Sequence, residues 1–475
     1  RSTRVRSSAA SDVYKRQYNH WATAGFFGRL NYNYKEKYLL EVNGRYDGTS
    51  RFMKDQRWNF FPSFSLGWNV ARENFWKPLE SVVNQFKLRG SWGELGNQNT
   101  SNLYPFYEIL PVKSNSGNWL VNGGKTNTAD IPSLVSTLLT WERVRSFNVG
   151  FDFGAFSNRL TGSFDYFVRK TVDMVGPAPQ LPLVLGIAPA IVNNADMKSY
   201  GFEIELSWRD RIGEVDYGVK FNLADAQQKV VKYPNTTNAF SDWYAGKMSG
   251  EIWGYTSLGI AKTDEEMKEH LASLPNGGQN QLGNKWGAGD IMYADINGDG
   301  KVDGGKGTLA DPGDQRIIGN STPRYNFGLV LDASYKGFDV SIFFQGVGKR
   351  DYAPIVGTNG AVFWGAVNNI WQSMAMEEHF DYFRPEGHPM GANLNGYYPR
   401  PDFTSNKNHQ VQTRYLQDAS YIRLKNLQIG YTLPKQWINK LHINRCRVYV
   451  SGDNLWTGTS LASMFDPETL AAGDW

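Results

Sequence analysis

Apolar and polar residues alternate in short segments along most of the chain. From Arg29 the sequence reads RLNYNYKEKYLLEVNGRYDG, in which Leu30, Tyr32 and Tyr34 alternate with polar neighbours. A period of two places successive side chains on opposite faces of a strand, so one face is apolar and the other is wet. Most of the segments are close to the roughly 9–11 residues that a tilted strand needs to cross a bilayer. Twelve segments show the pattern: 29–34, 38–46, 61–70, 86–92, 146–153, 160–168, 200–208, 215–223, 326–335, 338–344, 426–433 and 446–450.

The connections between these segments alternate in length. The odd-numbered connections are short, from Lys35–Lys37 to Pro434–Arg445, and the longest ones, 93–145, 224–325 and 345–425, are all even-numbered. Outer-membrane barrels combine short periplasmic turns with long extracellular loops, whereas a soluble sandwich has no reason to place its long loops at one end. The sequence therefore predicts an all-β, antiparallel transmembrane β-barrel with long extracellular loops.

In such a barrel the polar face lines the lumen and the apolar face meets lipid. Gly44, Gly67 and Gly150 are predicted on the lumenal face, where closely packed side chains leave little room. The alternative fold is a large soluble β-protein, either a sandwich or a propeller. No repeat of about 40–45 residues with a Trp-Asp signature is present, which weakens the propeller.

Composition agrees with an all-β chain, because 27 Phe, 25 Tyr, 16 Trp and 49 Gly occur in 475 residues. The net charge of +4 comes entirely from residues 1–17. The rest of the chain is balanced, so no nucleic-acid partner is expected. Residues 1–17 lack the apolar core of a signal peptide and are interpreted as a non-native tail, which leaves 18–475 as the protein. The longest apolar stretch, 181–192, contains two prolines and is too short for a membrane helix.

No catalytic or cofactor-binding residue is predicted, and the chain is not expected to be an enzyme. The six histidines show no HExxH spacing, and the sequence contains neither a GxSxG nor a Walker-type loop. Glu203 and Glu205 fall on the lumenal face, where charge is ordinary. Cys446, the only cysteine, is expected to be a small buried side chain on a strand. Six loop tryptophans could either stack on sugars or pack the loops together: Trp119, Trp243, Trp253, Trp364, Trp371 and Trp456.

The order of these features resembles the C-terminal part of TonB-dependent outer-membrane transporters of the SusC/RagA-like class. The resemblance spans nearly all of residues 26–467. It is carried by RLNYNYKEKYLLEVNGRYDGTSRF (29–52), WNFFPSFSLGWNV (58–70), FKLRGSWGELGNQN (86–99), FVRKTVDMV (167–175), NNADMKSYGFEIEL (193–206), DINGDGKVD (295–303), RIIGN (316–320), YIRLKNLQIGYTLP (421–434) and RVYVSGDNLWTGT (447–459).

The resemblance implies about the C-terminal half of a 22-stranded barrel, in the outer membrane of a Gram-negative bacterium. Residues 18–475 are then a fragment without signal peptide, plug or first strands, and with the closing strand missing. The implied function is TonB-dependent import of a large nutrient, either an oligosaccharide or a peptide. A SusD-like surface lipoprotein and the TonB complex, acting through the missing plug region, are the implied partners. The alternative function is a soluble, calcium-stabilised β-protein that binds or degrades glycans.

One motif has the chemistry of a metal site. Residues 295–303 read DINGDGKVD, with oxygen side chains at positions 1, 3 and 5, a glycine at position 6 and a backbone carbonyl at position 7. This pattern matches the oxygen shell of calcium in an EF-hand loop. The residue at position 12 is Lys306, which cannot bind a cation.

The resemblance implies that the last carboxylate is displaced to Asp314, with Asp311 as a rival. A structural calcium ion in an extracellular loop is therefore expected, and a plain Gly/Asp turn without metal is the alternative. Just upstream, Thr263 and Glu266 predict the start of a short helix by capping-box logic. The expected metal ligands are Asp295, Asn297, Asp299, the Lys301 carbonyl, Asp303 and Asp314.

Overall fold

The fold is known from a computed structural model. The structure describes residues 20–100, 103–177, 182, 184, 186–187, 190–354, 357–368, 375–402, 406–439 and 443–470. The predicted tail, residues 1–17, lies outside the described residues. No helix in the described part of the chain is long and apolar enough to cross a membrane.

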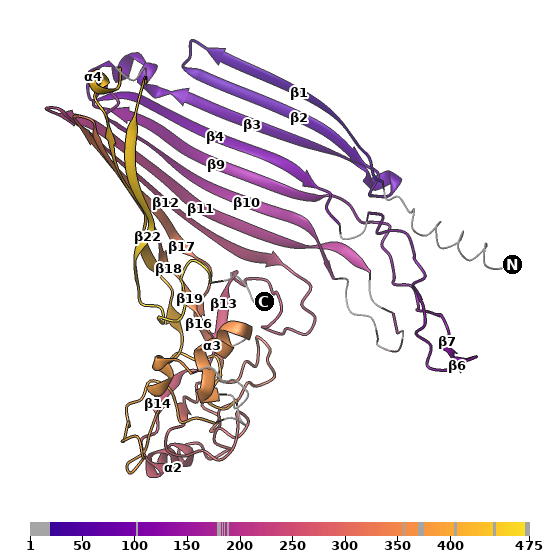
Figure 1. The fold of residues 1–475 in the computed structure, drawn as a ribbon. Helices are drawn as coiled ribbons and strands as arrows, with labels where there is room; N and C mark the ends of the chain where they lie inside the picture. The colour runs from indigo at the N-terminus through magenta and orange to yellow at the C-terminus, as the bar shows by residue number, and fades with distance from the viewer. Residues whose placement is uncertain are drawn as a thin grey trace, which may run out of the picture.

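Twelve antiparallel strands form one curved sheet, and each strand pairs with its nearest long neighbours in the sequence (Figure 1). All twelve predicted segments are confirmed as strands of this sheet. They are β1 (Thr23–Tyr34), β2 (Tyr38–Thr49), β3 (Trp58–Asn69), β4 (Val83–Asn97), β9 (Glu142–Ala155), β10 (Leu160–Pro177), β11 (Ile191–Ile212), β12 (Val215–Lys232), β17 (Arg324–Tyr335), β18 (Phe338–Lys349), β21 (Tyr421–Thr432) and β22 (Arg447–Thr459).

The remaining elements lie in the connections. The short strands are β5 (Val112–Lys113), β6 (Leu120–Val121), β7 (Gly124–Lys125), β8 (Thr128–Ala129), β13 (Glu251–Gly254), β14 (Ser257–Ile260), β15 (Ile291–Tyr293), β16 (Arg316–Asn320), β19 (Asp351–Tyr352) and β20 (Gln417–Asp418). The helices are α2 (Asp264–Ala272), α3 (Gly357–Asn368) and α4 (Lys435–Ile438), with 3₁₀ turns η1 (Lys54–Gln56), η2 (Val70–Arg72), η3 (Asn74–Leu79) and η5 (Glu377–Phe380). The predicted helix after Thr263 is confirmed as α2, because the Thr263 hydroxyl accepts a hydrogen bond from the Glu266 amide at 3.1 Å.

Several strands are longer than the sequence pattern predicts. β10 and β11 have 18 and 22 residues, so most of the predicted loop 169–199 continues the ladder. About half that length crosses a bilayer, and the remainder extends into water at the long-loop end. There the outer face carries ion pairs in place of lipid-facing residues: Arg145 contacts Glu94 at 2.6 Å and Arg143 contacts Asp173 at 2.7 Å.

The outer face of the membrane-spanning part is apolar and exposed. Leu30, Leu66 and Val450 are 63%, 62% and 76% exposed, as lipid-facing side chains of a barrel are in the absence of lipid. Aromatic rings gather near both ends of β1–β3: Tyr38 stacks with Tyr34 and Trp68 at one end, and Trp58 stacks with Phe26 and Tyr46 at the other. Two aromatic rows of this kind mark the two membrane interfaces.

The longest connections lie at one end of the sheet, as predicted. Residues 233–323 and 350–420 follow β12 and β18, whereas the two-residue turns 213–214 and 336–337 lie at the opposite end (Figure 1). The two long connections pack against each other around a shared core. Its fully buried residues include Tyr255, Tyr293, Val302, Trp364 and Tyr415. We call the described residues within 233–323 and 350–420 the loop unit.

Candidate functional site

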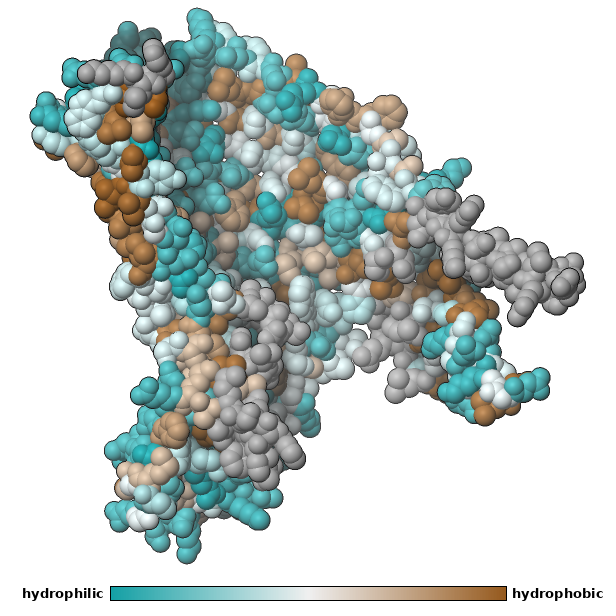
Figure 2. All heavy atoms as spheres, viewed as in Figure 1, coloured by the Kyte–Doolittle hydropathy of each residue, from teal (hydrophilic) through white to brown (hydrophobic). Residues whose placement is uncertain are grey.

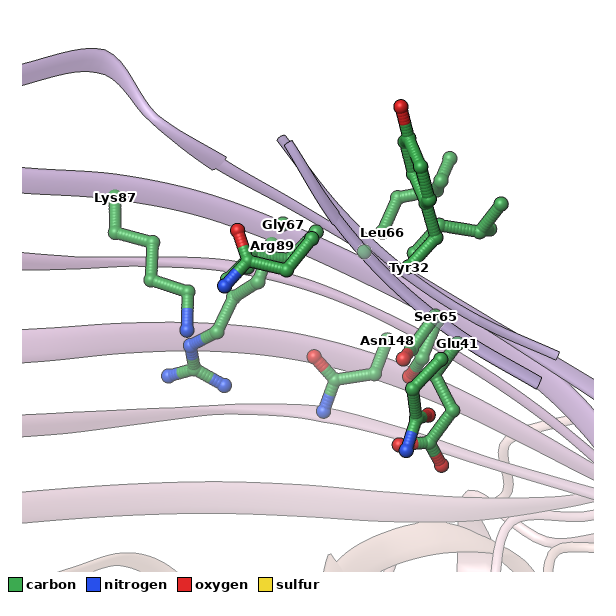
Figure 3. Close-up of a pocket in the computed structure, with 14 residues that line it drawn as sticks. Tyr32, Glu41, Ser65, Leu66, Gly67, Lys87, Arg89 and Asn148 are labelled. Atoms are coloured by element: carbon green, nitrogen blue, oxygen red, sulfur yellow. The ribbon is translucent and has the colours of Figure 1, made fainter. Parts of the chain in front are cut away.

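The inner face of the sheet is polar and hollowed. A pocket of about 510 Å³ lies over β1–β4 and β9. Figure 3 shows Glu41, Ser65, Lys87, Arg89 and Asn148 projecting from one side of the sheet, while Tyr32 and Leu66 project from the other. The predicted division into a wet lumenal face and an apolar outer face is therefore confirmed in this region.

One arginine joins three strands on the lumenal face. The guanidinium of Arg89 on β4 donates to both carboxylate oxygens of Asp165 on β10, at 2.7 and 2.6 Å, and also to Asp152 on β9 at 3.1 Å. Gly150 lies directly between Arg89 and Asp165 in the strand register. A Cβ atom at Gly150 would approach the Asp165 carboxylate to 2.6 Å and the Phe164 carbonyl to 2.4 Å. Gly150 therefore leaves the space that this two-oxygen ion pair occupies.

The same arrangement recurs near the other edge of the sheet. Arg447 on β22 reaches over β21 and contacts both carboxylate oxygens of Asp339 on β18. The glycine on the intervening strand is Gly430, where a Cβ atom would meet the Arg447 guanidinium at 2.5 Å. The lumenal prediction for Gly67 and Gly150 is confirmed, because each shares the face of Arg89. It is wrong for Gly44, which has the parity of Val42 and Tyr46 and contacts Phe60 on the outer face.

The predicted metal loop forms a compact turn in the loop unit. Asp295 accepts hydrogen bonds from the Gly298 and Gly300 amides at 2.7 and 2.8 Å. Gly298 and Gly300 have φ values of 77° and 81°, which favour glycine, so the sharp turn at position 6 is confirmed. Asn297 and Asp299 each accept a backbone amide two residues further on. The side chains at positions 1, 3 and 5 thus all fold back onto the turn.

Of the two candidates for the last carboxylate, Asp314 bonds to the backbone of the predicted loop, whereas the hydrogen bonds of Asp311 within the described structure go to Lys306 and Thr308. Asp314 is fully buried and accepts from the amides of Ile296 at 2.7 Å and Asp303 at 2.8 Å. Burial raises the pKa of the Asp314 carboxyl. The Lys301 ammonium contacts Asp303 and lies 3.8 Å from Asp299, which holds the pKa of Asp303 below its usual value.

The donor set of this loop is all oxygen and strongly anionic, which is the chemistry that calcium prefers. Its carboxylates already attract one cation, the Lys301 side chain. In the described part of the chain, no group of three or more His, Cys, Asp or Glu side chains is close enough together to hold a metal ion. A bound ion would therefore need the Asn297 oxygen and backbone carbonyls as well as carboxylates.

The histidines, the loop tryptophans and the cysteine have different surroundings in the structure. His379 is buried, and its ring contacts the carbonyls of Val362 and Phe363 at 3.1 Å. Trp364 is fully buried in the loop unit, so it packs the loops, and Trp253 stacks on Phe240. Trp119 and Trp243 are exposed in loops, whereas the loop prediction for Trp456 is wrong, because it is exposed on β22. Trp371 and His442 lie outside the described residues. The expectation for Cys446 is wrong: it is only half-buried and precedes β22.

Two features of the loop regions are not visible in the sequence pattern. Asp290 is completely buried and contacts Lys407 at 2.9 Å and Arg400 at 2.6 Å, so an ionic cluster joins the two long connections. Residues 460–470, which follow β22, are held by Arg423 through Asp466 and Glu468, each at 2.7 Å. Both features connect residues far apart in sequence, where periodicity carries no signal.

A curved antiparallel sheet with a polar inner face, an apolar aromatic-bordered outer face and loops at one end defines the wall of an outer-membrane β-barrel. The chain belongs to the TonB dependent receptor-like, beta-barrel family, whose model matches residues 3–455. The protein is therefore located in the outer membrane of a Gram-negative bacterium, and the alternative of a soluble β-protein is wrong.

The similar proteins support the SusC/RagA-like resemblance. TonB-dependent receptor P3 of Formosa agariphila is 30% identical over 96% of this chain and 43% of its own length. TonB-dependent receptor SusC of Bacteroides thetaiotaomicron is 24% identical over 94% of this chain and 42% of its own length. A solved structure of the RagAB peptide transporter covers 95% of this chain and 45% of its own, with a TM-score of 0.72 and 22% identity. The chain thus spans less than half the length of these relatives.

Proposed function

We propose that the chain forms part of the barrel wall of a TonB-dependent importer for a large nutrient, either an oligosaccharide or a peptide. The observation that carries the proposal is the continuous polar lumenal face, hollowed near Arg89 and joined at one end to the loop unit. A wall of this kind suits the passage of a hydrated solute, because its hydroxyls, amides and charges replace contacts with water.

The proposal includes two partners. A SusD-like surface lipoprotein would cover the long loops and deliver substrate, and the TonB complex would act through the plug region of a longer protein. Support comes from the family match and from the resemblance to SusC and to the RagAB peptide transporter. The outer-membrane lipid would contact the apolar band that includes Leu30 and Val450.

The test is uptake by cells that carry or lack the full-length gene. We expect the deletion strain to lose uptake of one class among fluorescent oligosaccharides and peptides, and a protonophore to abolish the same uptake in the parent. Deletion of the neighbouring lipoprotein gene should lower uptake at low substrate concentration. Unchanged uptake of every substrate in the deletion strain, or a protonophore-resistant uptake, would contradict the proposal.

We also propose that the loop 295–314 binds one Ca²⁺ that stabilises the loop unit. The supporting observations are the oxygen donor set, the left-handed glycines of the turn and the approach of Asp314 to it. Bound calcium would neutralise several carboxylates that otherwise repel each other. The ion is structural in this proposal, because the residues around the turn are bonded to one another and no side chain there is positioned as a nucleophile.

The calcium proposal is tested by limited proteolysis and calorimetry on the full-length protein. We expect chelation, or Asp299→Ala, to increase cleavage between about residues 260 and 320 while the barrel stays intact. Glu265→Ala is the matched control, since it removes an exposed carboxylate from α2 and leaves the turn unchanged. An unchanged cleavage pattern after chelation, together with no calcium binding by calorimetry, would show a plain Gly/Asp turn.

A further inference from the structure

A second pocket lies on the lumenal face where β11 and β12 meet the loop unit. Its volume is about 420 Å³. Met197 and Val230 face each other across the two strands, in the same alternation that places Glu203 on the lumenal face. Trp243 and Met248 complete the apolar part of the lining, and the polar part consists of Gln228, Ser241, Lys247 and Ser249. The pocket is therefore at the mouth of the barrel, on the side that faces a solute.

The wall opposite the strands is fixed by backbone hydrogen bonds. The Gly246 amide donates to the Val230 carbonyl at 2.8 Å, and the Ser249 amide donates to the Gln228 carbonyl at 2.9 Å. The Met248 amide donates to Glu251, whose carboxylate also accepts from Tyr244. The pocket is consequently present before any ligand arrives, and little ordering is needed on binding.

Lys247 fixes the turn that carries Trp243. Its ammonium donates to the backbone carbonyls of Phe240, Ser241 and Asp242 at 2.9, 3.2 and 2.9 Å. Three carbonyls use the three protons of an ammonium group, so Lys247 has no proton left for a ligand. Lys247 therefore has a structural role in the pocket. The described lining residues include no free cation that could bind an anion.

The free groups of the pocket indicate the class of ligand. The Trp243 ring is 42% exposed and presents an aromatic surface to the pocket. The side chains of Gln228, Ser241 and Ser249 make no hydrogen bond within the described structure, so an amide and two hydroxyls are available. An apolar amino-acid side chain would bury these polar groups unpaired, which is costly. A pyranose ring fits both demands, because it has an apolar C–H face and a rim of hydroxyls.

We propose that this pocket, called the Trp243 pocket, is a binding subsite for one neutral sugar ring of an oligosaccharide. The inference rests on the proposed import function and deepens it by choosing oligosaccharide over peptide. The sugar would stack on Trp243 and exchange hydrogen bonds with Gln228, Ser241 and Ser249. A subsite at the barrel mouth would hold the chain end before it enters the lumen.

The test is binding of neutral oligosaccharides to the detergent-purified full-length protein. The probes are cello-, laminari-, xylo- and malto-hexasaccharides, and calorimetry measures each Kd. We expect at least one probe to bind, Trp243→Ala to weaken it roughly tenfold or more, and Trp243→Phe to stay within about threefold. Gln228→Leu should also weaken binding, because it removes hydrogen bonds and keeps the size of the side chain.

Trp119→Ala is the matched control, since Trp119 is also an exposed loop tryptophan, at 61%, and lies outside the Trp243 pocket. It should bind the probe like the parent protein. Equal affinity of Trp243→Ala and parent protein for the probe would overturn the proposal. So would binding of peptides alone, measured with a random hexapeptide pool, although energy-dependent uptake of peptides would leave the import proposal standing. Loss of binding in Trp119→Ala as well as in Trp243→Ala would show a general defect and also reject the subsite.

Discussion

Gly150 shows how a single missing side chain organises charges on a barrel wall. Arg89 and Asp165, two strands apart, form their paired contact across Gly150, where a Cβ atom would overlap the Asp165 carboxylate. The contact is partly buried, so a misplaced Asp165 would leave Arg89 without its strongest partner. Glycine is thus required here by the space that the Arg89 and Asp165 side chains occupy. It is not required by the backbone, which has an ordinary extended conformation at Gly150.

Substitution of Gly150 tests this requirement. We expect Gly150→Ala in the full-length protein to lower the free energy of unfolding by about 1–3 kcal/mol, because the methyl group overlaps Asp165 and the Phe164 carbonyl. Gly28→Ala on β1 is the control, since a Cβ atom there meets nothing within 4 Å. Urea titration of the detergent-solubilised protein gives both values. Equal stability of the two variants would show that Asp165 relaxes without cost.

His409 gives the loop unit a dependence on pH. The imidazole is buried against Trp364, with ring centroids 4.3 Å apart, and neither ring nitrogen has a hydrogen-bond partner among the described residues. Burial lowers the pKa of His409 to about 4, partly offset by Asp402. Unfolded chain binds the proton near its ordinary value of 6.5, so the unfolded state holds more protons between about pH 6.5 and 4. The stability of the loop unit must therefore fall as the pH falls through this window.

We expect the fluorescence of the loop unit to change at lower denaturant concentration at pH 5 than at pH 7.5. His409→Gln should reduce this difference, while His388→Gln, which changes a partly exposed histidine of the same connection, should keep it. Denaturation curves of the three full-length proteins at both pH values make the comparison. An identical pH effect in His409→Gln and the parent would assign the effect to another group.

At the scale of elements, residues 460–470, which follow β22, are bonded to the long-loop end of the sheet, and we call them the strap. Arg423 is almost fully buried and donates to Thr457, Asp466 and Glu468, and Lys425 also contacts Glu468 at 2.7 Å. Arg350 donates to the Leu470 carbonyl at 3.1 Å, and Leu461 and Leu470 pack on Ala419. The strap thus depends on cations of β21 more than on its own short apolar surface.

Removal of the central cation should release the strap. We expect Arg423→Ala to expose residues 460–470 to protease, because it leaves two carboxylates without their main partner. The bond to Arg423 lowers the pKa of Asp466, so its contribution is present above the ordinary value of 3.8 and is lost as the pH falls below it. Arg211→Ala, which breaks the exposed pair with Asp216, is the control. Mass spectrometry of the fragments measures cleavage within residues 460–470. Equal resistance of the two variants to cleavage would contradict the expectation.

The elements that could be predicted are those with a local signal. Period-two alternation located all twelve long strands, and the Thr263 cap located α2. The extension of β10 and β11 could not be predicted, because pairing in water needs no apolar face. The core of the loop unit joins Tyr255 and Tyr293 with Trp364 and Tyr415 from the other connection, and no repeat links them. The lumenal prediction for Gly44 conflicts with the local pattern itself, since period-two alternation from Val42 places Gly44 on the outer face.

In the candidate sites, too, features with a local sequence signal could be predicted, and features that join distant residues could not. The turn at 295–303 has a fixed local spacing, so its geometry followed from the sequence, and Asp314 followed only from the resemblance. The Trp243 pocket needs β11, β12 and a turn more than forty residues from Met197 along the chain. Trp243 could be named as an exposed loop tryptophan beforehand, but its neighbours Gln228 and Met197 could not. Calcium binding itself stays a prediction.

At the scale of the whole molecule, the sheet has two open edges. Within the described residues β1 pairs only with β2, and β22 pairs only with β21 (Figure 1). Hydrophobic residues lie along the outer side of the β22 edge, where Val448 and Val450 are 62% and 76% exposed (Figure 2). Open edges beside apolar surface favour pairing between chains.

We therefore expect residues 18–475, expressed alone, to form inclusion bodies or an aggregated sheet in detergent. Sedimentation after expression measures the outcome, and the full-length protein, in which further strands can pair with both edges, is the control. A monomeric product that stays in solution and unfolds cooperatively would contradict the expectation, since it would require both edges to be satisfied within this chain.

The simple order of the sheet also determines how it can be assembled. Each long strand between β1 and β22 pairs with the long strands before and after it, and two-residue turns such as 213–214 and 336–337 join neighbours directly. Closing a short connection has a small entropic cost, so each hairpin can form locally before it joins the growing wall. The loop unit is different, because its two connections are separated by the β17–β18 hairpin. Pairing of β17 with β18 brings the two connections together, so we expect the core of the loop unit to form after this hairpin.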